Sequence, residues 1–152
     1  MTLTRGFIRN AETTPLDARL MDMAKIVANA DGSPRPGVLG GANASIVSAT
    51  GTMHVAIAAA EFATSKGRAD GVTIFTNDGA VNIEIDPAPA SNSRIDTIYA
   101  KHNDDTTGDA DALPVFGVAK GTAAASPVKA AIPTGALELA TLRIYAGTTA
   151  TN

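Results

Sequence analysis

The 152-residue sequence contains no cysteine and no tryptophan, and its aromatic content is only 4%. Without cysteine, the chain can form neither a disulfide framework nor a thiolate metal site, and it has no cysteine nucleophile. Few aromatic rings are available to stack on sugars or on nucleic-acid bases, which argues against a carbohydrate-binding or a base-stacking function. No window reaches the ~18 consecutive apolar residues of a membrane span, and no signal-peptide core follows Arg5 and Arg9. We therefore expect a protein made in a cytoplasm, without membrane insertion.

Net charge and chain length narrow the possible classes of protein further. The formal net charge is −3 and the isoelectric point is near 5.2, whereas nucleic acids and anionic membranes select basic surfaces. A chain of this length suits one domain, which can bury a sizeable core without metal or disulfide support. The expected partners therefore do not include nucleic acid.

A search for catalytic patterns finds little. The two histidines, His54 and His102, stand far apart in the chain with no metal-ligand spacing around either. No phosphate-binding loop, nucleophile elbow, zinc-helix motif or dinucleotide fingerprint is present. Asp86, Asp96 and Glu138 would make a glycosidase pair only if the fold brought two of them together. We expect no enzyme, with no catalytic, cofactor-binding or metal-binding residues.

One acidic loop is a weak candidate for a cation site. Asn103, Asp105, Thr107 and Gly108 offer oxygen atoms at loop-like offsets, but Pro114 stands where an EF-hand loop needs a bidentate glutamate. A polar turn is favoured over a calcium site.

One helix is predicted near the N-terminus, over Pro15–Ala28. Thr14 is suited to cap it, Pro15 occupies the favoured first position, and Asp17 completes a capping box. Apolar residues recur on one face at Leu16, Leu20, Met23, Ala24 and Val27. Packing on the chain's own sheet is favoured over a three-helix seam in a trimer, and the helix is also expected to contribute to attachment.

The remaining chain reads as strands and turns. Met53–Phe62 is predicted as one strand, with a helix that starts in its alanine-rich part as the alternative. Asn77-Asp78-Gly79 is predicted to join Val72–Thr76 and Val81–Ile85 in a hairpin. Three further strands are predicted over Arg94–Lys101, Pro114–Lys120 and Leu137–Ala146.

Three more expectations concern side chains in these strands. Arg94 and Asp96 share a strand face, and a solvated ion pair is favoured there over a buried one. The apolar phase of the last strand changes near Ala140-Thr141, which predicts either a bulge or a strand that moves from the core to an interface. The predicted core consists of Val72, Ile74, Val81, Ile83, Ile95, Ile98, Val115, Val118, Leu137 and Leu139.

The predicted architecture is therefore mainly β, an antiparallel β-sandwich with one N-terminal α-helix. Residues 1–32 form an arm and helix for attachment or oligomerisation, and residues 33–43 form a linker rich in proline and glycine. Residues 44–147 form the sandwich, and residues 148–152 a polar tail.

The same sequence carries a family resemblance between Asp86 and Gly147. The segments S-R-I-D, P-V-F-G-V-A-K-G-T-A-A-A-S-P and I-P-T-G-A-L-E-L-A-T-L-R-I-Y-A-G resemble a β-sandwich module of siphophage minor tail proteins, particularly in phages of actinobacteria. The first twenty residues match the same group more loosely. The resemblance implies a virion structural protein of the tail tip or baseplate that supports host adsorption.

That resemblance also implies partners and a location. The chain is expected to form a homotrimer or ring, to contact other tail proteins, and to reach the virion after synthesis in the host cytoplasm. A host cell-surface glycan is a further partner to consider. The alternatives are a capsid decoration or head-fibre protein, and a carbohydrate-binding module in which Tyr99 or Tyr145 lies beside Asp or Asn in a groove.

Overall fold

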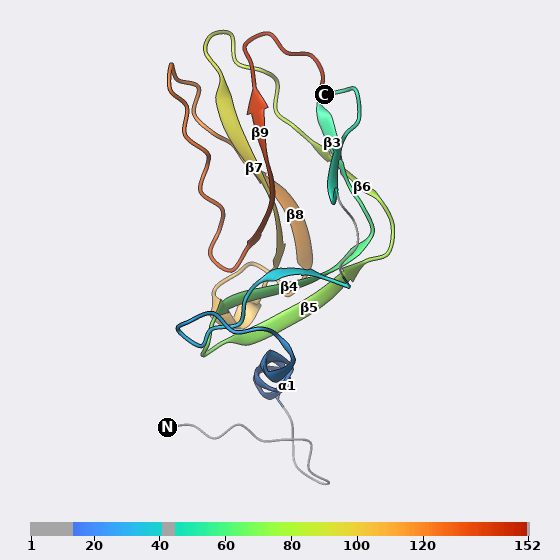
Figure 1. Cartoon of the computed structure of the whole chain (residues 1–152), viewed down its shortest axis with the longest axis vertical. Coiled ribbons are helices and arrows are strands. Elements are labelled where there is room, and N and C mark those ends of the chain that lie inside the picture. Colours follow the sequence, from blue (N-terminus) through green and yellow to red (C-terminus); the bar gives the residue numbers. More distant parts are fainter. Residues whose placement is uncertain (1–13, 41–44, 152) are drawn as a thin grey trace.

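The computed structural model describes residues 14–40 and 45–151, and this part of the chain is mainly β. It contains three antiparallel sheets and one N-terminal α-helix (Figure 1). The predicted fold class is therefore confirmed.

Helix α1 spans Pro15–Asp22 and continues as one 3-10 turn over Met23–Lys25. Its start is as predicted, because the Asp17 amide donates to Thr14 Oγ1 at 3.1 Å and the Thr14 amide donates to the Asp17 carboxylate at 3.0 Å. The predicted end at Ala28 was too late. The Val27 carbonyl accepts from the Arg35 amide at 2.8 Å, which turns this part of the chain back on itself instead of extending the helix.

Within residues 14–40 and 45–151, nine strands form three sheets of three. One has the order β1-β4-β5, formed by Gly37–Leu39, Ala60–Gly67 and Gly71–Asn77. The second has the order β2-β3-β6, formed by Val47–Ala49, His54–Ile57 and Val81–Glu84. The third has the order β8-β7-β9, formed by Pro114–Ala119, Arg94–His102 and Leu137–Ile144. The three strands predicted in the C-terminal half are thus confirmed, with ends that differ by at most two residues.

The predicted hairpin across Asn77-Asp78-Gly79 was wrong. Strands β5 and β6 lie in different sheets, and β5 pairs with β4 through the turn after Gly67. The predicted single strand over Met53–Phe62 is likewise two strands, β3 and β4, in different sheets. Pairing with β4 places Phe75 opposite Phe62, with ring centroids 5.3 Å apart. An aromatic cross-strand pair stabilises that choice, which a local turn signal does not reveal.

The three sheets surround one core. The β2-β3-β6 and β8-β7-β9 sheets stand side by side, and β4 and β5 run across one end near α1 (Figure 1). The core cluster draws residues from all three: Val55, Ile57, Ala60, Phe62, Phe75, Ile85, Ile98, Ala100 and Ile144. The arrangement is sandwich-like, with the β1-β4-β5 sheet closing its lower end (Figure 1).

The predicted core was partly right. Val72 and Ile98 are buried, but Ile74 is 41% exposed on the outer face of β5. The other predicted core residues are half-buried: Val81, Ile83, Ile95, Val115, Val118, Leu137 and Leu139. Phe62, the largest fully buried side chain, was missed. It was placed at the end of the predicted strand Met53–Phe62, whereas it lies inside β4.

Strand β9 contains a bulge beside the predicted position. Ile98 pairs with Ala140 while the adjacent Tyr99 pairs with Glu138, so Leu139 is the extra residue. The bulge changes the phase of the strand. As a result, Leu137, Leu142 and Ile144 all reach the same core.

Two segments predicted as connections take part in the fold. The predicted linker 33–43 contains β1, which pairs with β4. In the predicted tail 148–152, Thr151 is buried, and its amide donates to the Thr52 carbonyl at 2.7 Å. The division of the chain into an attachment segment and a sandwich stays a prediction.

Candidate functional site: a polar junction and an open sheet edge

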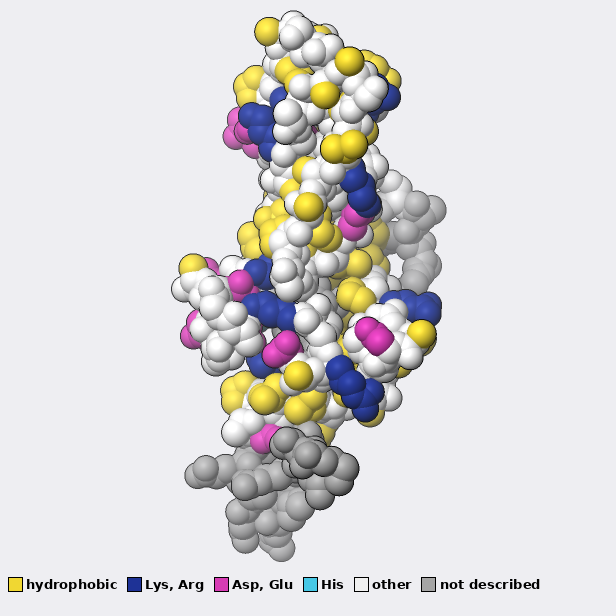
Figure 2. All heavy atoms as spheres, turned by 90° about the vertical axis from the view of Figure 1, so that its left-hand side faces the viewer, with side chains coloured by type: hydrophobic (Ala, Val, Ile, Leu, Met, Phe, Trp, Pro, Cys, Tyr) yellow, Lys and Arg dark blue, Asp and Glu magenta, His cyan; other side chains and the backbone are white. Residues whose placement is uncertain are grey.

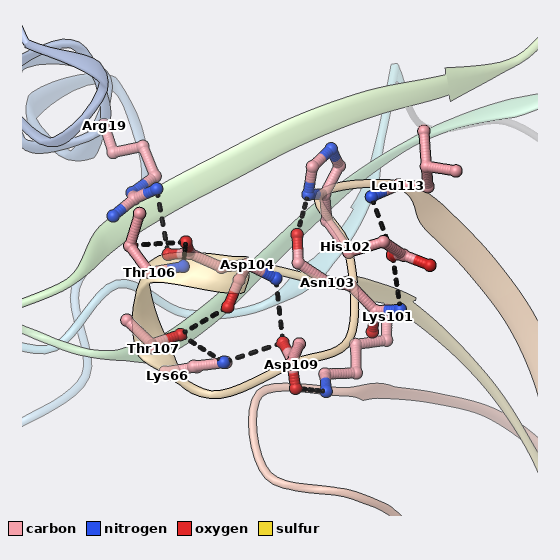
Figure 3. Close-up of polar contacts among 11 residues, drawn as sticks. Arg19, Lys66, Lys101, His102, Asn103, Asp104, Thr106, Thr107, Asp109 and Leu113 are labelled. Carbon is pink, nitrogen blue, oxygen red and sulfur yellow. Dashed lines mark hydrogen bonds and ion pairs between the residues drawn. The ribbon is translucent and has the colours of Figure 1, made fainter.

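A cluster of charged side chains joins the helix to the sandwich (Figure 3). Arg19 projects from α1, where its Nε donates to the Asp70 carbonyl at 3.0 Å and its Nη1 lies 3.0 Å from Asp104 Oδ2. The backbone of Arg19 is also close to Gly71, because an added Cβ at Gly71 would lie 2.6 Å from the Arg19 carbonyl carbon. The helix is therefore held against the end of β5 by both backbone packing and charge.

Asp109 is the centre of this polar junction. Its Oδ1 accepts from Lys101 Nζ at 2.5 Å, and its Oδ2 accepts from Lys66 Nζ at 2.7 Å and from the Asp104 amide at 2.8 Å. The hydrogen bonds from Lys101 and then Lys66 hold the pKa of Asp109 well below its ordinary value. One carboxylate thus ties together β4, β7 and the loop that follows β7.

Asp104 organises the loop itself. Its Oδ1 accepts from the Thr106 amide at 3.0 Å and from the Thr106 hydroxyl at 2.5 Å, which caps the short 3-10 turn Asp105–Thr107. The Thr106 hydrogen bonds lower the pKa of Asp104, and the charge of Arg19 adds to that effect. The loop is therefore stabilised with Asp104 and Asp109 both ionised.

The residues predicted as a weak calcium candidate have other contacts. Asn103 Nδ2 donates to Asp111 Oδ1 at 2.9 Å, Thr107 contacts Lys66 Nζ, and Gly108 adopts a φ of 95° at the end of the turn. Among residues 14–40 and 45–151, no group of three or more Asp, Glu or His side chains is placed to hold a metal ion. Lysine ammonium groups stand beside the Asp109 oxygens where a bound cation would otherwise lie.

The Arg94–Asp96 pair is buried, which corrects the prediction of a solvated pair. The side chains are 3% and 0% exposed, and Arg94 Nε lies 3.0 Å from both carboxylate oxygens of Asp96. Arg94 also donates to the Asp86 and Pro87 carbonyls at 2.6 Å, and Asp96 accepts from the Gly121 amide at 2.8 Å. Both charges are therefore neutralised and hydrogen-bonded, which makes their burial tolerable.

Each candidate catalytic carboxylate is paired with a basic side chain. Asp96 is paired with Arg94, Asp86 lies 2.7 Å from Lys120, and Glu138 lies 2.6 Å from Lys129. The hydrogen bond from Lys120 lowers the pKa of Asp86, which is opposite to the shift that a general acid needs.

The two histidines lie in different sheets. His54 is on β3, with Nδ1 3.2 Å from the Thr52 hydroxyl, and His102 is at the end of β7, with Nδ1 2.7 Å from the Asn103 carbonyl. Neither ring lies beside a candidate catalytic carboxylate in the contacts above.

An open groove of about 390 Å³ lies between β2 and β9. The two strands belong to different sheets, and the buried residues Val55 and Ile98 lie at the bottom of the groove. Its rims are formed by Val47, Ser48, Ala49, Ala140, Thr141 and Leu142. This volume is in the range of ligand sites, but the lining combines aliphatic side chains with serine and threonine and offers no ionisable group.

The tyrosines differ in exposure. Tyr99 is half-buried over Gly117, where an added Cβ would lie 2.5 Å from the ring. Tyr145 is 61% exposed, and the Arg143 guanidinium stands 5.4 Å from its ring centroid. The 240 Å³ groove beside Tyr145 is lined by Leu142, Arg143, Ile144, Tyr145, Thr148, Ala150 and Thr151. It contains neither the Asp nor the Asn that a sugar site at this ring was expected to have.

Sequence reasoning missed the polar junction. Lys66 and Asp109 are 43 positions apart, and Arg19 and Asp70 are 51 apart, so no local spacing relates them. The only local signal was the Asp104-x-Thr106 pattern typical of a capped turn.

On the face shown in Figure 2, basic and acidic side chains are interspersed. No helix in the part of the chain that the structure describes is long and apolar enough to cross a membrane. No family model, curated protein or solved structure matches this chain.

Proposed function

We propose that this chain is a bacteriophage virion structural protein, a minor tail protein of the tail tip or baseplate. It would assemble as a symmetric oligomer, contact other tail proteins and support host adsorption. The sequence resemblance between Asp86 and Gly147 motivates the proposal. Within that segment the chain folds as the complete β8-β7-β9 sheet, so the resembling stretch corresponds to a structural unit.

The observation that carries the proposal is the open side of the sandwich. Strands β2 and β9 are both terminal in their sheets, and the groove between them reaches down to the core residues Val55 and Ile98. A subunit that works by burying interface area needs such a surface. The paired carboxylates and separated histidines described above favour an interaction role over a catalytic one.

A carbohydrate-binding module is a second candidate, favoured only by the exposure of Tyr145. An exposed ring provides a stacking platform for a sugar. The Arg143 guanidinium already lies over the Tyr145 ring, which makes the glycan function the weaker proposal.

The test is gold-labelled antibody against this chain on intact particles, viewed by electron microscopy. Label at the tail tip is the expected result. Label over the head would replace the proposal with the capsid decoration or head-fibre alternative. Particles without label would refute a virion role, and glycan-array binding by the purified chain would then test the carbohydrate function.

A further inference from the structure

Strand β9 presents a long free edge. It pairs with β7 on one side, and no strand among the described residues pairs with its other side. At eight residues it is as long as any strand except β7. Backbone amides and carbonyls along such an edge are a template for another strand.

The bulge at Leu139 determines which side chains face outward along this edge. Ala140 pairs with Ile98 of the core face, whereas Glu138 pairs with Tyr99 of the opposite face. Glu138, Thr141 and Arg143 are all exposed on the outer face of β9. In an unbulged strand Glu138 and Arg143, five positions apart, would face opposite sides.

We propose that β9 pairs antiparallel with β9 of a second copy of this chain, about a two-fold axis at Thr141. With Leu139 left out of the register, this places Glu138 opposite Arg143 of the partner subunit, and Arg143 opposite the partner's Glu138. Thr141 meets the partner's Thr141 on the axis. The outer face is thus self-complementary in charge, as a two-fold interface requires.

The same register also pairs apolar residues on the inner face of β9. Ala140 and Leu142 line the 390 Å³ groove and would lie opposite the partner's Leu142 and Ala140. A leucine from each copy therefore lies beside the groove of the other, over Val55 and Ile98. Three strands from each copy give one continuous sheet of six, β8-β7-β9 followed by the partner's β9-β7-β8.

The present contacts of the two charged residues are compatible with this pairing. Glu138 binds Lys129, and both side chains remain more than one third exposed. Arg143 donates to Ser93 Oγ at 3.0 and 3.1 Å and stays exposed at the strand edge. These charges act mainly on register and specificity, since exposed ion pairs add little affinity.

Among the described strands, no other sheet-edge strand contains both an acidic and a basic residue: β1 and β8 have no charged residue, and β6 has only Glu84. Strand β5 is also terminal in its sheet, but Gly71–Asn77 contains no charged residue to select a register. β2 has only three residues. The proposal concerns this edge alone and does not depend on the virion role, so either can fail without the other.

The test is sedimentation equilibrium of the full chain and of charge-reversed variants. Wild type is expected to form a dimer in a concentration-dependent manner. Glu138→Lys places two arginine–lysine pairs in the interface, and Arg143→Glu places two glutamate pairs there. Each is expected to weaken dimerisation at least about tenfold. Circular dichroism and thermal melts establish that each variant remains folded.

Two rescues make the register falsifiable. An equimolar mixture of Glu138→Lys with Arg143→Glu restores opposite charges at both positions, and so does the double variant in its homodimer. Both are expected to recover the wild-type dimer, whereas Lys129→Ala, which removes only the intramolecular partner of Glu138, is expected to leave dimerisation unchanged. A monomer at all concentrations, or a dimer that ignores both reversals, would overturn the proposal.

A cross-link provides an independent reading of the axis. The chain has no native cysteine, so Thr141→Cys introduces the only thiol. Residues directly opposite in an antiparallel pair have Cα atoms about 4.5–5.5 Å apart, which suits a disulfide. Oxidised Thr141→Cys is expected to give a covalent dimer, and Thr76→Cys on the exposed edge strand β5 is the matched control. Equal cross-linking at both positions would show non-specific contact and refute the register.

Discussion

The two charged centres of this protein are built in opposite ways. Arg94 and Asp96 are neighbours on one strand and are almost completely buried. The polar junction instead gathers Arg19, Lys66 and Lys101 around Asp104 and Asp109 from four separate segments, and its side chains keep about 10–19% exposure. The first centre joins residues close together in the sequence and is buried. The second joins residues far apart in the sequence and is partly exposed to solvent.

This difference in burial indicates which of the two centres contributes more to the stability of the fold. Removing one member of a buried pair leaves an uncompensated charge in a low-dielectric site, at a cost of several kcal/mol. Partly exposed charges can instead be solvated when a partner is lost, so each contact contributes less. We expect the Arg94–Asp96 pair to determine global stability and the polar junction to determine how firmly the helix and loop are attached.

The largest effect is predicted for Asp96→Asn. The change leaves the Arg94 charge buried beside a neutral amide and weakens the contact to Gly121. We expect a loss of about 3–5 kcal/mol in the free energy of unfolding, measured by urea denaturation. Asp86→Asn is the control, because its exposed pair with Lys120 is solvated and should contribute little. Similar losses in the two variants would mean that the buried pair has no special role.

This pair also marks the limit of prediction from sequence. The face shared by Arg94 and Asp96 follows from their spacing of two, but their burial does not. It depends on Asp86, Pro87 and Gly121, which arrive from the flanking connections. Period and turn residues were sufficient for the capped start of α1 and for the strands β7, β8 and β9, since those signals are local.

Strand partners were the part that sequence could not supply. The Asp78-Gly79 turn looks like a hairpin, yet β5 turns away to pair with β4 and bring Phe75 onto Phe62. A turn signal reports local backbone preference, whereas pairing is decided by side-chain packing between distant segments. The polar junction was missed for the same reason, because its lysines and aspartates meet only after the sheets have formed.

The second prediction detaches the helix from the sheet. Gly71 has a φ of 70°, and a Cβ there would lie 2.6 Å from the Arg19 carbonyl carbon and 2.8 Å from the Leu20 amide nitrogen. Gly71→Ala therefore carries the left-handed backbone cost of about 1–2 kcal/mol together with a backbone clash. Hydrogen exchange of the α1 amides should become faster.

Gly51→Ala is the matched control for that change. Its φ is 76°, and no atom outside its chain neighbours lies within 4 Å of the added Cβ. The two variants therefore share the backbone cost but differ in the clash. Unchanged α1 exchange in Gly71→Ala would show that the helix is not anchored at this point.

The smallest effect is predicted for Asp109→Asn, which removes the shared acceptor of Lys66 and Lys101. The loss should be smaller than for Asp96→Asn, and the wild-type advantage should shrink as salt rises, because ions screen partly exposed charges. Urea denaturation at low and high salt measures this difference. Asp105→Asn, an exposed change in the same loop, is the control.

The acid response gives a second test of Asp109. The lysine hydrogen bonds lower the pKa of Asp109 in the folded protein, whereas an unfolded aspartate titrates near about 3.9. Its contribution is therefore complete above about pH 5 and is lost as the pH falls below about 4 toward the folded-state pKa. Wild type should lose more stability than Asp109→Asn between about pH 6 and pH 3. Parallel acid profiles for the two proteins would mean that the ionised Asp109 carboxylate does not hold the polar junction together.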